Sequence, residues 1–405
     1  MKRKIYLGTN VYEEAIKRIE RLYDEFDEVV VGFSGGKDST VVLNLAIEVA
    51  KKLNRLPVKT IFIDQEAEWG CVIDYIRRTM HRPEVEAMWY QMPLRISNST
   101  SHDEMWLMCW KDGDDGKWIR DKEPDSLKEN HFGTLTFGKL FNEILKKDIT
   151  SQKACLIGGV RCEESPARTN GLTNALTYKD IAWGKFVYNN KKTGKERYIF
   201  YPIYDWTLPD VWKAINDNGW EYSKLYDYQY QHGISLNNMR VSNVHHETAT
   251  NTLHYMQEVE PEMYQKVQQR LKGVNTEKTL GEDASLVKTL PYMFKDWREY
   301  RDFLLEGLVK DEGIRKRFAM HFKRYDKLES KSKLLDESFN REMVKAILKN
   351  DYHSVTVTNW FMKPDIVCYI MYKEGKLDQV KKVRNQYLEE EFGKAIYKPR
   401  EEVTA

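Results

Sequence analysis

The chain is poor in cysteine, with 5 in 405 residues. No two of them form a C-x-x-C pair, so the sequence offers no ligand set for a zinc ribbon or an iron–sulfur cluster. We therefore expect no iron–sulfur cluster. Few and scattered cysteines are typical of a reducing compartment, which predicts a cytoplasmic protein. The five are Cys71, Cys109, Cys155, Cys162 and Cys368.

Long apolar runs and a net charge excess are also absent. No run reaches the roughly 18 apolar residues of a membrane-spanning helix, and the charged N-terminus lacks the apolar core of a signal peptide, so we expect no membrane segment. Lysine plus arginine (64) and aspartate plus glutamate (62) nearly cancel, which argues against a strongly basic nucleic-acid binder. A basic stretch near 310–333 could still contact nucleic acid or an acidic partner, although a solvated helix face is the commoner explanation.

The first 240 residues alternate between strand and helix patterns. Such alternation predicts an α/β fold with a doubly wound, mostly parallel sheet. Residues 95–135 break the pattern, and we interpret them as a surface insertion or lid. We expect strands at 28–33, 58–64, 85–94 and 154–160, a hairpin that turns near Asn189–Gly194, and helices at 11–26, 39–53, 68–80 and 137–147.

Strand patterns nearly vanish after about residue 245, where helical spacing dominates. The sequence therefore predicts two domains. The first is an α/β domain over residues 1–240, and the second is a helical domain over residues 241–405.

The stretch "VVVGFSGGKDST" ends a buried strand pattern and opens a helix pattern. A glycine-rich turn between a strand and a helix N-terminus binds phosphate, because free backbone N–H groups point at the anion. Gly35 and Gly36 allow the backbone to bend and to approach a ligand. The remaining members add three hydroxyls, one cation and one carboxylate: Ser34, Ser39, Thr40, Lys37 and Asp38.

The carboxylate of Asp38 would repel phosphate, so we expect it to hold a Mg²⁺ ion between itself and the phosphates, or to cap the helix. A Walker loop is excluded, because Gly36-Lys37 is followed by Asp38 and no other Gly-Lys pair precedes Ser or Thr. A G-x-G-x-x-G fingerprint is absent as well. The simpler alternative is a plain strand–helix turn.

A second motif, G-x-R-x-x-E-S-x-x-R, runs from Gly159 to Arg168 at the end of a predicted strand. Ligands of open α/β sheets bind at such strand ends. Arg161 and Arg168 suit a phosphate or sulfate group, and Glu164 would pair with one of them to fix its orientation. The alternative is a surface helix start with an i, i+4 pair between Glu164 and Arg168.

The loop SGGKDS is the signature of the ATP pyrophosphatase superfamily, also called PP-loop or N-type. Together with the second motif and the segment "YPIYDWTLPDVW", it makes residues 20–235 resemble the phosphoadenylyl-sulfate (PAPS) reductase family. Within that family the chain most resembles the IbrA-type proteins. The resemblance implies an adenine nucleotide alpha hydrolase-like fold that binds ATP or a related adenine nucleotide. It also implies cleavage between the α- and β-phosphates.

The motifs and the resemblance together predict the site residues. Catalytic roles fall to Lys37, Asp38, Arg161 and Arg168, with Mg²⁺ at Asp38. Nucleotide contacts are predicted for Ser34, Gly35, Gly36, Lys37, Asp38, Ser39, Thr40, Asp64, Gly159, Arg161 and Glu164.

The turn after the second strand departs from the family. The family often has Asp-Thr-Gly there, whereas this chain has "DQEAE", residues 64–68. Asp64 keeps the shared position and is predicted to face the ribose or base. Glu66 and Glu68 either attract a metal or an amino group, or are helix N-terminal acids favoured by the dipole, and we leave both interpretations open.

The reducing cysteine of the PAPS reductase tail is absent, because the chain ends "FGKAIYKPREEVTA". Met239, Arg240 and Val241 stand where the iron–sulfur branch has cysteines. Thiol-based sulfate reduction is therefore not expected. Two hypotheses remain: an ATP pyrophosphatase or adenylyltransferase with an unknown substrate, or a non-catalytic sensor of an adenine nucleotide or adenylyl sulfate. The sensor would regulate a ParB-like partner, because IbrA-type proteins resemble regulators encoded beside such a protein.

Overall fold

The computed structural model describes residues 7–101, 103–173, 175–245, 250–274, 287, 289–326, 333–361 and 367. The chain divides into two compact units. The sheet unit comprises residues 9–284, and the helical unit comprises residues 285–405 together with 1–8. Each unit is described by itself.

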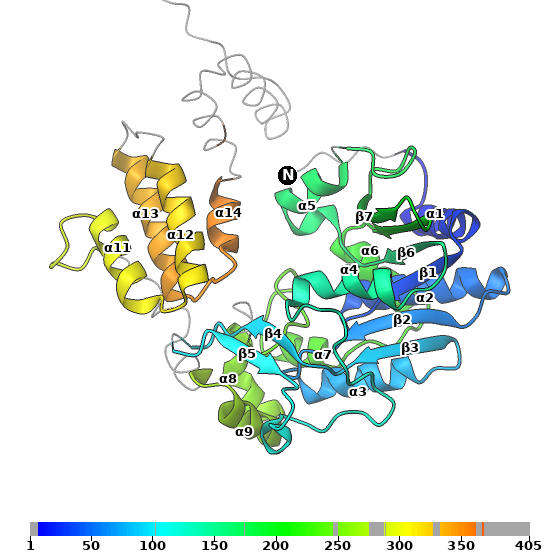
Figure 1. The fold of residues 1–405 in the computed structure, drawn as a ribbon, viewed down its shortest axis with the longest axis horizontal. Coiled ribbons are helices and arrows are strands. Elements are labelled where there is room, and N and C mark those ends of the chain that lie inside the picture. Colours follow the sequence, from blue (N-terminus) through cyan, green and yellow to red (C-terminus); the bar gives the residue numbers. More distant parts are fainter. Residues whose placement is uncertain are drawn as a thin grey trace, which may run out of the picture. The chain divides into compact units, whose positions relative to one another are not determined.

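The central sheet of the sheet unit has six strands within the described residues, in the order β3-β2-β1-β6-β8-β7 (Figure 1). Five strands are parallel and β7 is antiparallel to β8, which confirms the predicted mostly parallel α/β fold. The order runs outward in two directions from β1 and β6, so the topological switch point lies between these two strands. The bounds are β1 Glu28–Gly32, β2 Val58–Ile63, β3 Val85–Tyr90, β6 Lys153–Ile157, β7 Gly184–Asn190 and β8 Lys195–Phe200.

Helices connect the strands of this unit. Asn10 caps the first helix by accepting the Tyr12 N–H at 2.8 Å, and Thr207 and Asp210 form the capping box of another. Every predicted strand and helix named above is present, and so is the hairpin that turns after Asn190. The helices are α1 Val11–Glu25, α2 Lys37–Lys52, α3 Gly70–Met80, α4 Phe137–Lys147, α5 Pro166–Thr173, α6 Leu208–Asp217, α7 Leu225–Gln231, α8 Thr250–Val259 and α9 Pro261–Arg270, with short 3-10 turns η1 Asp115–Lys117 and η2 Cys162–Glu164.

The third strand is shorter than expected, because β3 ends at Tyr90 and not at residue 94. Beyond it, the Gln91 N–H donates to the Leu127 carbonyl of the insertion at 3.0 Å. Residues 94–97 then belong to a separate two-stranded antiparallel sheet of β4 Leu94–Ser97 and β5 Trp106–Cys109. The predicted insertion over 95–135 thus contains its own hairpin.

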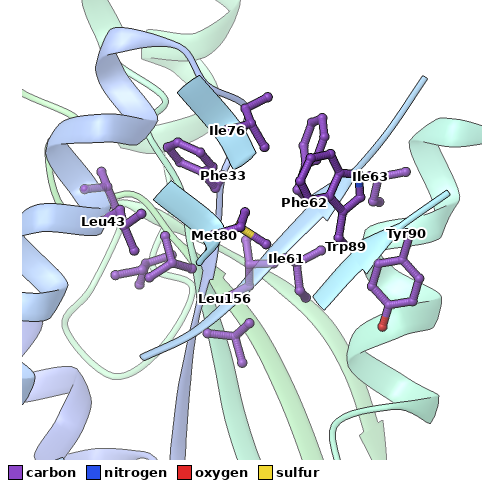
Figure 2. Close-up of a cluster of buried hydrophobic side chains, with 14 of the residues drawn as sticks. Phe33, Leu43, Ile61, Phe62, Ile63, Ile76, Met80, Trp89, Tyr90 and Leu156 are labelled. Atoms are coloured by element: carbon purple, nitrogen blue, oxygen red, sulfur yellow. The ribbon is translucent and has the colours of Figure 1, made fainter. Parts of the chain in front are cut away.

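Buried apolar side chains pack tightly near the carboxyl ends of the strands. Figure 2 shows Ile76 and Met80 of α3 beside Phe33, which follows β1, and Ile61 of β2. All four are at most 3% exposed. Close packing of this kind fixes the positions of the loops that leave the strands.

The helical unit contains four helices within its described residues. Arg301 is buried there and donates to Asn340 at 2.8 Å, with Asp326 close by at 3.3 Å. This unit confirms the predicted helical C-terminal region. The basic stretch near 310–333 falls largely on α12, and its contact with nucleic acid stays a prediction. The four are α11 Trp297–Leu308, α12 Glu312–Asp326, α13 Lys333–Leu348 and α14 Val355–Phe361.

Helices α8 and α9 follow residue 240 but belong to the compact unit of the sheet. The proposed domain boundary at 240/241 stays a prediction. Among the described helices, none is both long and apolar enough to cross a membrane.

Candidate functional site

The glycine-rich loop joins β1 to α2 at the switch point of the sheet. Gly35 has φ +73°, and a Cβ there would lie 3.0 Å from the Ile76 side chain, so any other residue would be strained and crowded. The Ser39 hydroxyl donates to the Gly36 carbonyl at 2.8 Å and accepts the Ser34 N–H at 3.2 Å. These two serines shape the loop from within. Gly36 is the N-cap of α2 and has no side chain to cover the first-turn amides.

Two motifs that lie far apart in sequence meet on the carboxylate of Asp38. Its Oδ1 accepts from Arg161 Nε at 2.6 Å, and its Oδ2 lies 3.1 Å from Lys37 Nζ. Lys37 and Arg161 are only 7% and 4% exposed. Arg161 also contacts Glu163 at 3.1 Å. The structure therefore brings three predicted catalytic residues together at the N-terminus of α2.

Gly159 makes this meeting possible. A Cβ at this position would lie 2.7 Å from the Asp38 carbonyl carbon and 2.8 Å from the Ser39 amide nitrogen. Any other residue would therefore collide with the backbone of the first turn of α2. The close approach follows from the sheet order, because β6 pairs directly with β1.

Arg168 and Glu164 lie at the rim of this group. They form the i, i+4 ion pair of the simpler interpretation, on η2 and α5. Partial burial lowers the pKa of the Arg168 guanidinium, and the charge of Asp38 opposes that shift. Arg168 therefore lies within the electric field of the loop.

The Thr40 hydroxyl points away from the loop. It is fully buried and lies 2.7 Å from the Tyr75 hydroxyl of α3. Its predicted contact with the nucleotide stays a prediction.

Tyr226 is a site residue that the motifs did not reveal. Its hydroxyl accepts the Lys37 N–H at 2.9 Å, and its ring lies 5.7 Å below Lys37 Nζ. Tyr226 lies on α7, 189 residues from Lys37, within a tyrosine-rich segment that matches no motif. Its hydroxyl occupies one of the amides that a phosphate would use.

Asp64 is sealed inside the protein. Its Oδ2 accepts from Trp89 Nε1 at 2.9 Å and Gln91 Nε2 at 3.0 Å. Its Oδ1 accepts the Glu66 N–H at 2.9 Å and pairs with Arg120 from the insertion. Both oxygens are therefore used within the protein, and contact with a ribose or base stays a prediction.

Glu66 binds other segments of the protein. The sequence had left open a metal or amino-group site and a helix N-terminal acid, and neither interpretation included this role. Its carboxylate accepts from Arg270 of α9 at 2.7 and 3.0 Å and from the Trp110 N–H at 2.9 Å. The Ile119 N–H lies 3.4 Å from the same group. Glu66 has no exposed surface. It fastens both the insertion and α9 to the end of β2.

Glu68 is buried and its Oε2 has no hydrogen-bond partner. Burial raises the pKa of Glu68 to about 8; the charge of Asp64 adds to the shift and Arg120 opposes it. The carboxyl is therefore neutral at pH 7. Arg120 Nε and Nη1 are also buried without a hydrogen-bond partner. The region around the turn after β2 therefore contains buried polar atoms from Glu68 and Arg120 that make no hydrogen bond.

A resident metal site does not fit the described residues. They contain no group of three or more His, Cys, Asp or Glu side chains that could hold a metal ion. Asp38 supplies a single carboxylate, and both of its oxygens face cations. A Mg²⁺ ion could enter only with ligands from elsewhere, as it does when it arrives on nucleotide phosphates.

The fold and the loop define a class: a mostly parallel α/β protein with a phosphate-binding type of loop at its switch point. The chain belongs to the phosphoadenosine phosphosulfate reductase domain family, whose model matches residues 28–232. A domain of unknown function, DUF3440, matches residues 233–385. The predicted closeness to IbrA-type proteins stays a prediction.

The chain is similar to several known proteins. The uncharacterised protein YbdN of Escherichia coli K12 is 28% identical over 338 residues, which cover 80% of this chain and 82% of YbdN. Sulfate adenylyltransferase subunit 2 of Mycobacterium sp. KMS is 25% identical over 216 residues, which cover 51% of this chain and 60% of that subunit.

Among solved structures, FMN adenylyltransferase of Candida glabrata with FMN and an ATP analogue has a TM-score of 0.35 at 14% identity, covering 60% of this chain and 66% of that one. The PAPS reductase of Candida auris has a TM-score of 0.30 at 13% identity, covering 56% and 94%.

Proposed function

We propose that the sheet unit binds ATP or a related adenine nucleotide at the loop Ser34–Thr40 and cleaves ATP between its α- and β-phosphates. The AMP group passes to an unknown substrate and pyrophosphate leaves. The observation that carries this proposal is the meeting of Lys37, Asp38 and Arg161 at the N-terminus of α2. Family membership and the similarity to a protein named as a sulfate adenylyltransferase subunit support it.

The residues divide the work by their chemistry. The first-turn amides of α2 would bind phosphate oxygens. An oxyanion of the substrate would attack the α-phosphorus, and the bond to the bridging oxygen of pyrophosphate would break. Lys37 and Arg161 would stabilise the charge that develops on the departing oxygens, and Arg168 would add to it from the rim. Asp38 would orient both cations and meet a Mg²⁺ ion that enters with the nucleotide.

Thiol-based sulfate reduction is not part of this proposal. Cys109 and Cys155 are buried, and burial raises the pKa of both thiols well above its usual range. Thiols of this kind are poor nucleophiles. Cys368 lies outside the described residues.

A second candidate is a non-catalytic sensor of an adenine nucleotide or adenylyl sulfate. The contact of Tyr226 with the Lys37 N–H favours it, because nucleotide binding would then have to displace the Tyr226 hydroxyl of α7. Such a sensor would act in the cytoplasm and pass its state to a ParB-like partner. The basic stretch near 310–333 could add contacts to nucleic acid.

The test is incubation with ATP labelled at the α-phosphate, with AMP products and pyrophosphate measured in parallel. The first candidate predicts both products and their loss in Asp38→Asn. Tight binding by calorimetry with ATP left intact would favour the sensor. A protein that binds no adenine nucleotide at all would exclude both candidates.

A further inference from the structure

Helix α7 holds two segments of the chain with one face. Tyr226 contacts the loop through the Lys37 N–H. Gln229 exchanges two hydrogen bonds with the main chain of Arg240, at 2.8 Å to its carbonyl and 3.0 Å from its N–H. Positions three apart share a helix face and are separated by a rise of about 4.5 Å. The loop and the main chain of Arg240 are thus both held by side chains on one face of α7.

The two side chains of α7 that position the loop and Arg240 are buried. Tyr226 and Gln229 are 3% and 1% exposed. The main-chain N–H of Val241 lies close to the same Tyr226 oxygen that accepts from Lys37. A buried side-chain amide with both of its hydrogen bonds made fixes the backbone that it holds.

The side chain of Arg240 is exposed. Within the described part of the chain its guanidinium pairs with no carboxylate. It nevertheless belongs to the loop's surroundings, because its charge and that of Arg161 act on Arg168 and help to lower the pKa of that guanidinium. Asp38 acts on the same group in the opposite direction. Geometry and electrostatics therefore place Arg240 near the rim of the site.

The cations around the loop differ in what they are paired with. Lys37 and Arg161 share Asp38, and Arg168 has Glu164. Arg240 is the member of this group, among the described residues, whose guanidinium has no carboxylate partner. A guanidinium fork binds sulfate, phosphate or carboxylate through two parallel hydrogen bonds.

We propose that Arg168 and Arg240 form a second anion subsite beside the loop, and that it takes the oxyanion group of the substrate that receives AMP. This subsite rests on the proposed function. Arg240 lies outside the match to the reductase domain and inside the match to DUF3440. The first residues of the extension would thus complete the site of the domain that precedes them.

The test uses the full chain saturated with AMPCPP, an ATP analogue that resists cleavage between the α- and β-phosphates. Sodium sulfate, phosphate and acetate are titrated separately at constant ionic strength, with calorimetry as the readout. We expect the wild type to bind one of these anions. Preference for sulfate or phosphate would indicate a tetrahedral oxyanion, and preference for acetate would indicate a carboxylate. Arg240→Ala should weaken that binding at least about tenfold, the value of one charge-assisted hydrogen bond.

Two variants keep the result interpretable. Arg240→Lys retains the charge without the fork and should give an intermediate affinity. Lys185→Ala removes one exposed charge from β7 and should change nothing. AMPCPP affinity should stay within about threefold in all three variants, because Arg240 lies at the rim.

Equal anion affinity in the wild type and Arg240→Ala, or no anion binding by the AMPCPP complex, overturns the subsite and leaves the nucleotide site intact. If the wild type binds no AMPCPP, the proposed function fails instead. In that case the anion titrations are repeated without nucleotide, and equal affinity in the wild type and Arg240→Ala would exclude the subsite.

Discussion

The loop after β1 and the turn after β2 lie at the carboxyl ends of adjacent parallel strands. Both carry carboxylates that face arginines. In the loop, Asp38 keeps part of its surface exposed and meets cations at the N-terminus of a helix. In the turn, Asp64 and Glu66 have no exposed surface and pair with Arg120 and Arg270.

The difference shows that a position at the ligand-binding edge does not by itself make a residue a ligand-binding one. What separates the two regions is the origin of the partner cations. Arg161 comes from the neighbouring strand end, and around it Ser34 stays exposed while Asp38 stays partly exposed. Arg120 and Arg270 come from the insertion and from α9, and those segments cover the turn. The predictions below test this division between an open loop and a sealed turn.

The largest effect is expected for Glu68→Gln. The folded protein keeps Glu68 neutral up to a pKa of about 8, whereas the unfolded chain ionises it near 4.5. Stability therefore falls as pH rises between these values, because the folded state binds the extra proton. One pKa unit is worth about 1.4 kcal/mol, so wild type should lose on the order of 5 kcal/mol relative to the variant across this window.

Urea unfolding of both proteins from pH 4.5 to 8.5 measures that difference. Other titrating groups cancel, because they are common to the two proteins. A constant difference in unfolding free energy across the window would mean that Glu68 is solvated and that the turn is not sealed.

The second effect is on the ion pair beneath the insertion. Arg270→Ala leaves Glu66 charged and buried without its partner, which costs about 3–5 kcal/mol. Nucleotide affinity at the loop should be preserved. The matched control is Arg78→Ala, whose partner Glu221 is exposed, and exposed pairs are worth about 0–1 kcal/mol. Thermal unfolding distinguishes the two, and equal shifts would contradict the sealed turn.

These partners explain what sequence could and could not foresee. The α/β order followed from hydrophobic periodicity, and the meeting of Lys37, Asp38 and Arg161 followed from two local motifs at neighbouring strand ends. Arg270 lies 204 residues from Glu66, and Tyr226 lies 189 residues from Lys37. No local pattern marks such pairs, because they arise only when the chain packs.

The insertion gives the same lesson. The sequence predicted a surface insertion or lid over residues 95–135, and many polar residues of this segment are exposed. Trp110 is nevertheless fully buried and donates from Nε1 to the Asp64 carbonyl at 2.9 Å. Composition averages over both faces of a segment, so it hides the few residues that anchor it.

The third effect is on the open loop. Arg161→Ala removes the cation that orients Asp38, and loss of one preorganised donor lowers turnover about 10²–10³-fold. Pyrophosphate release measures it. The melting temperature should fall less than in Arg270→Ala, because Lys37 still neutralises Asp38. Arg161→Lys should recover part of the rate, and a variant that melts early but turns over normally would assign Arg161 to the fold instead.

The smallest effect is expected for Tyr226→Phe, and its sign is informative. Without the hydroxyl, the Lys37 N–H loses its acceptor in the free protein, at a cost of about 1 kcal/mol. A bound phosphate would satisfy that N–H, so the loss disappears in the complex. AMPCPP affinity measured by calorimetry should therefore rise about fivefold while the stability of the free protein falls. Weaker AMPCPP binding would show that the Tyr226 hydroxyl contacts the nucleotide directly. Tyr226 would then be a ligand-binding residue of the loop, and not a group that the phosphate displaces from the Lys37 N–H.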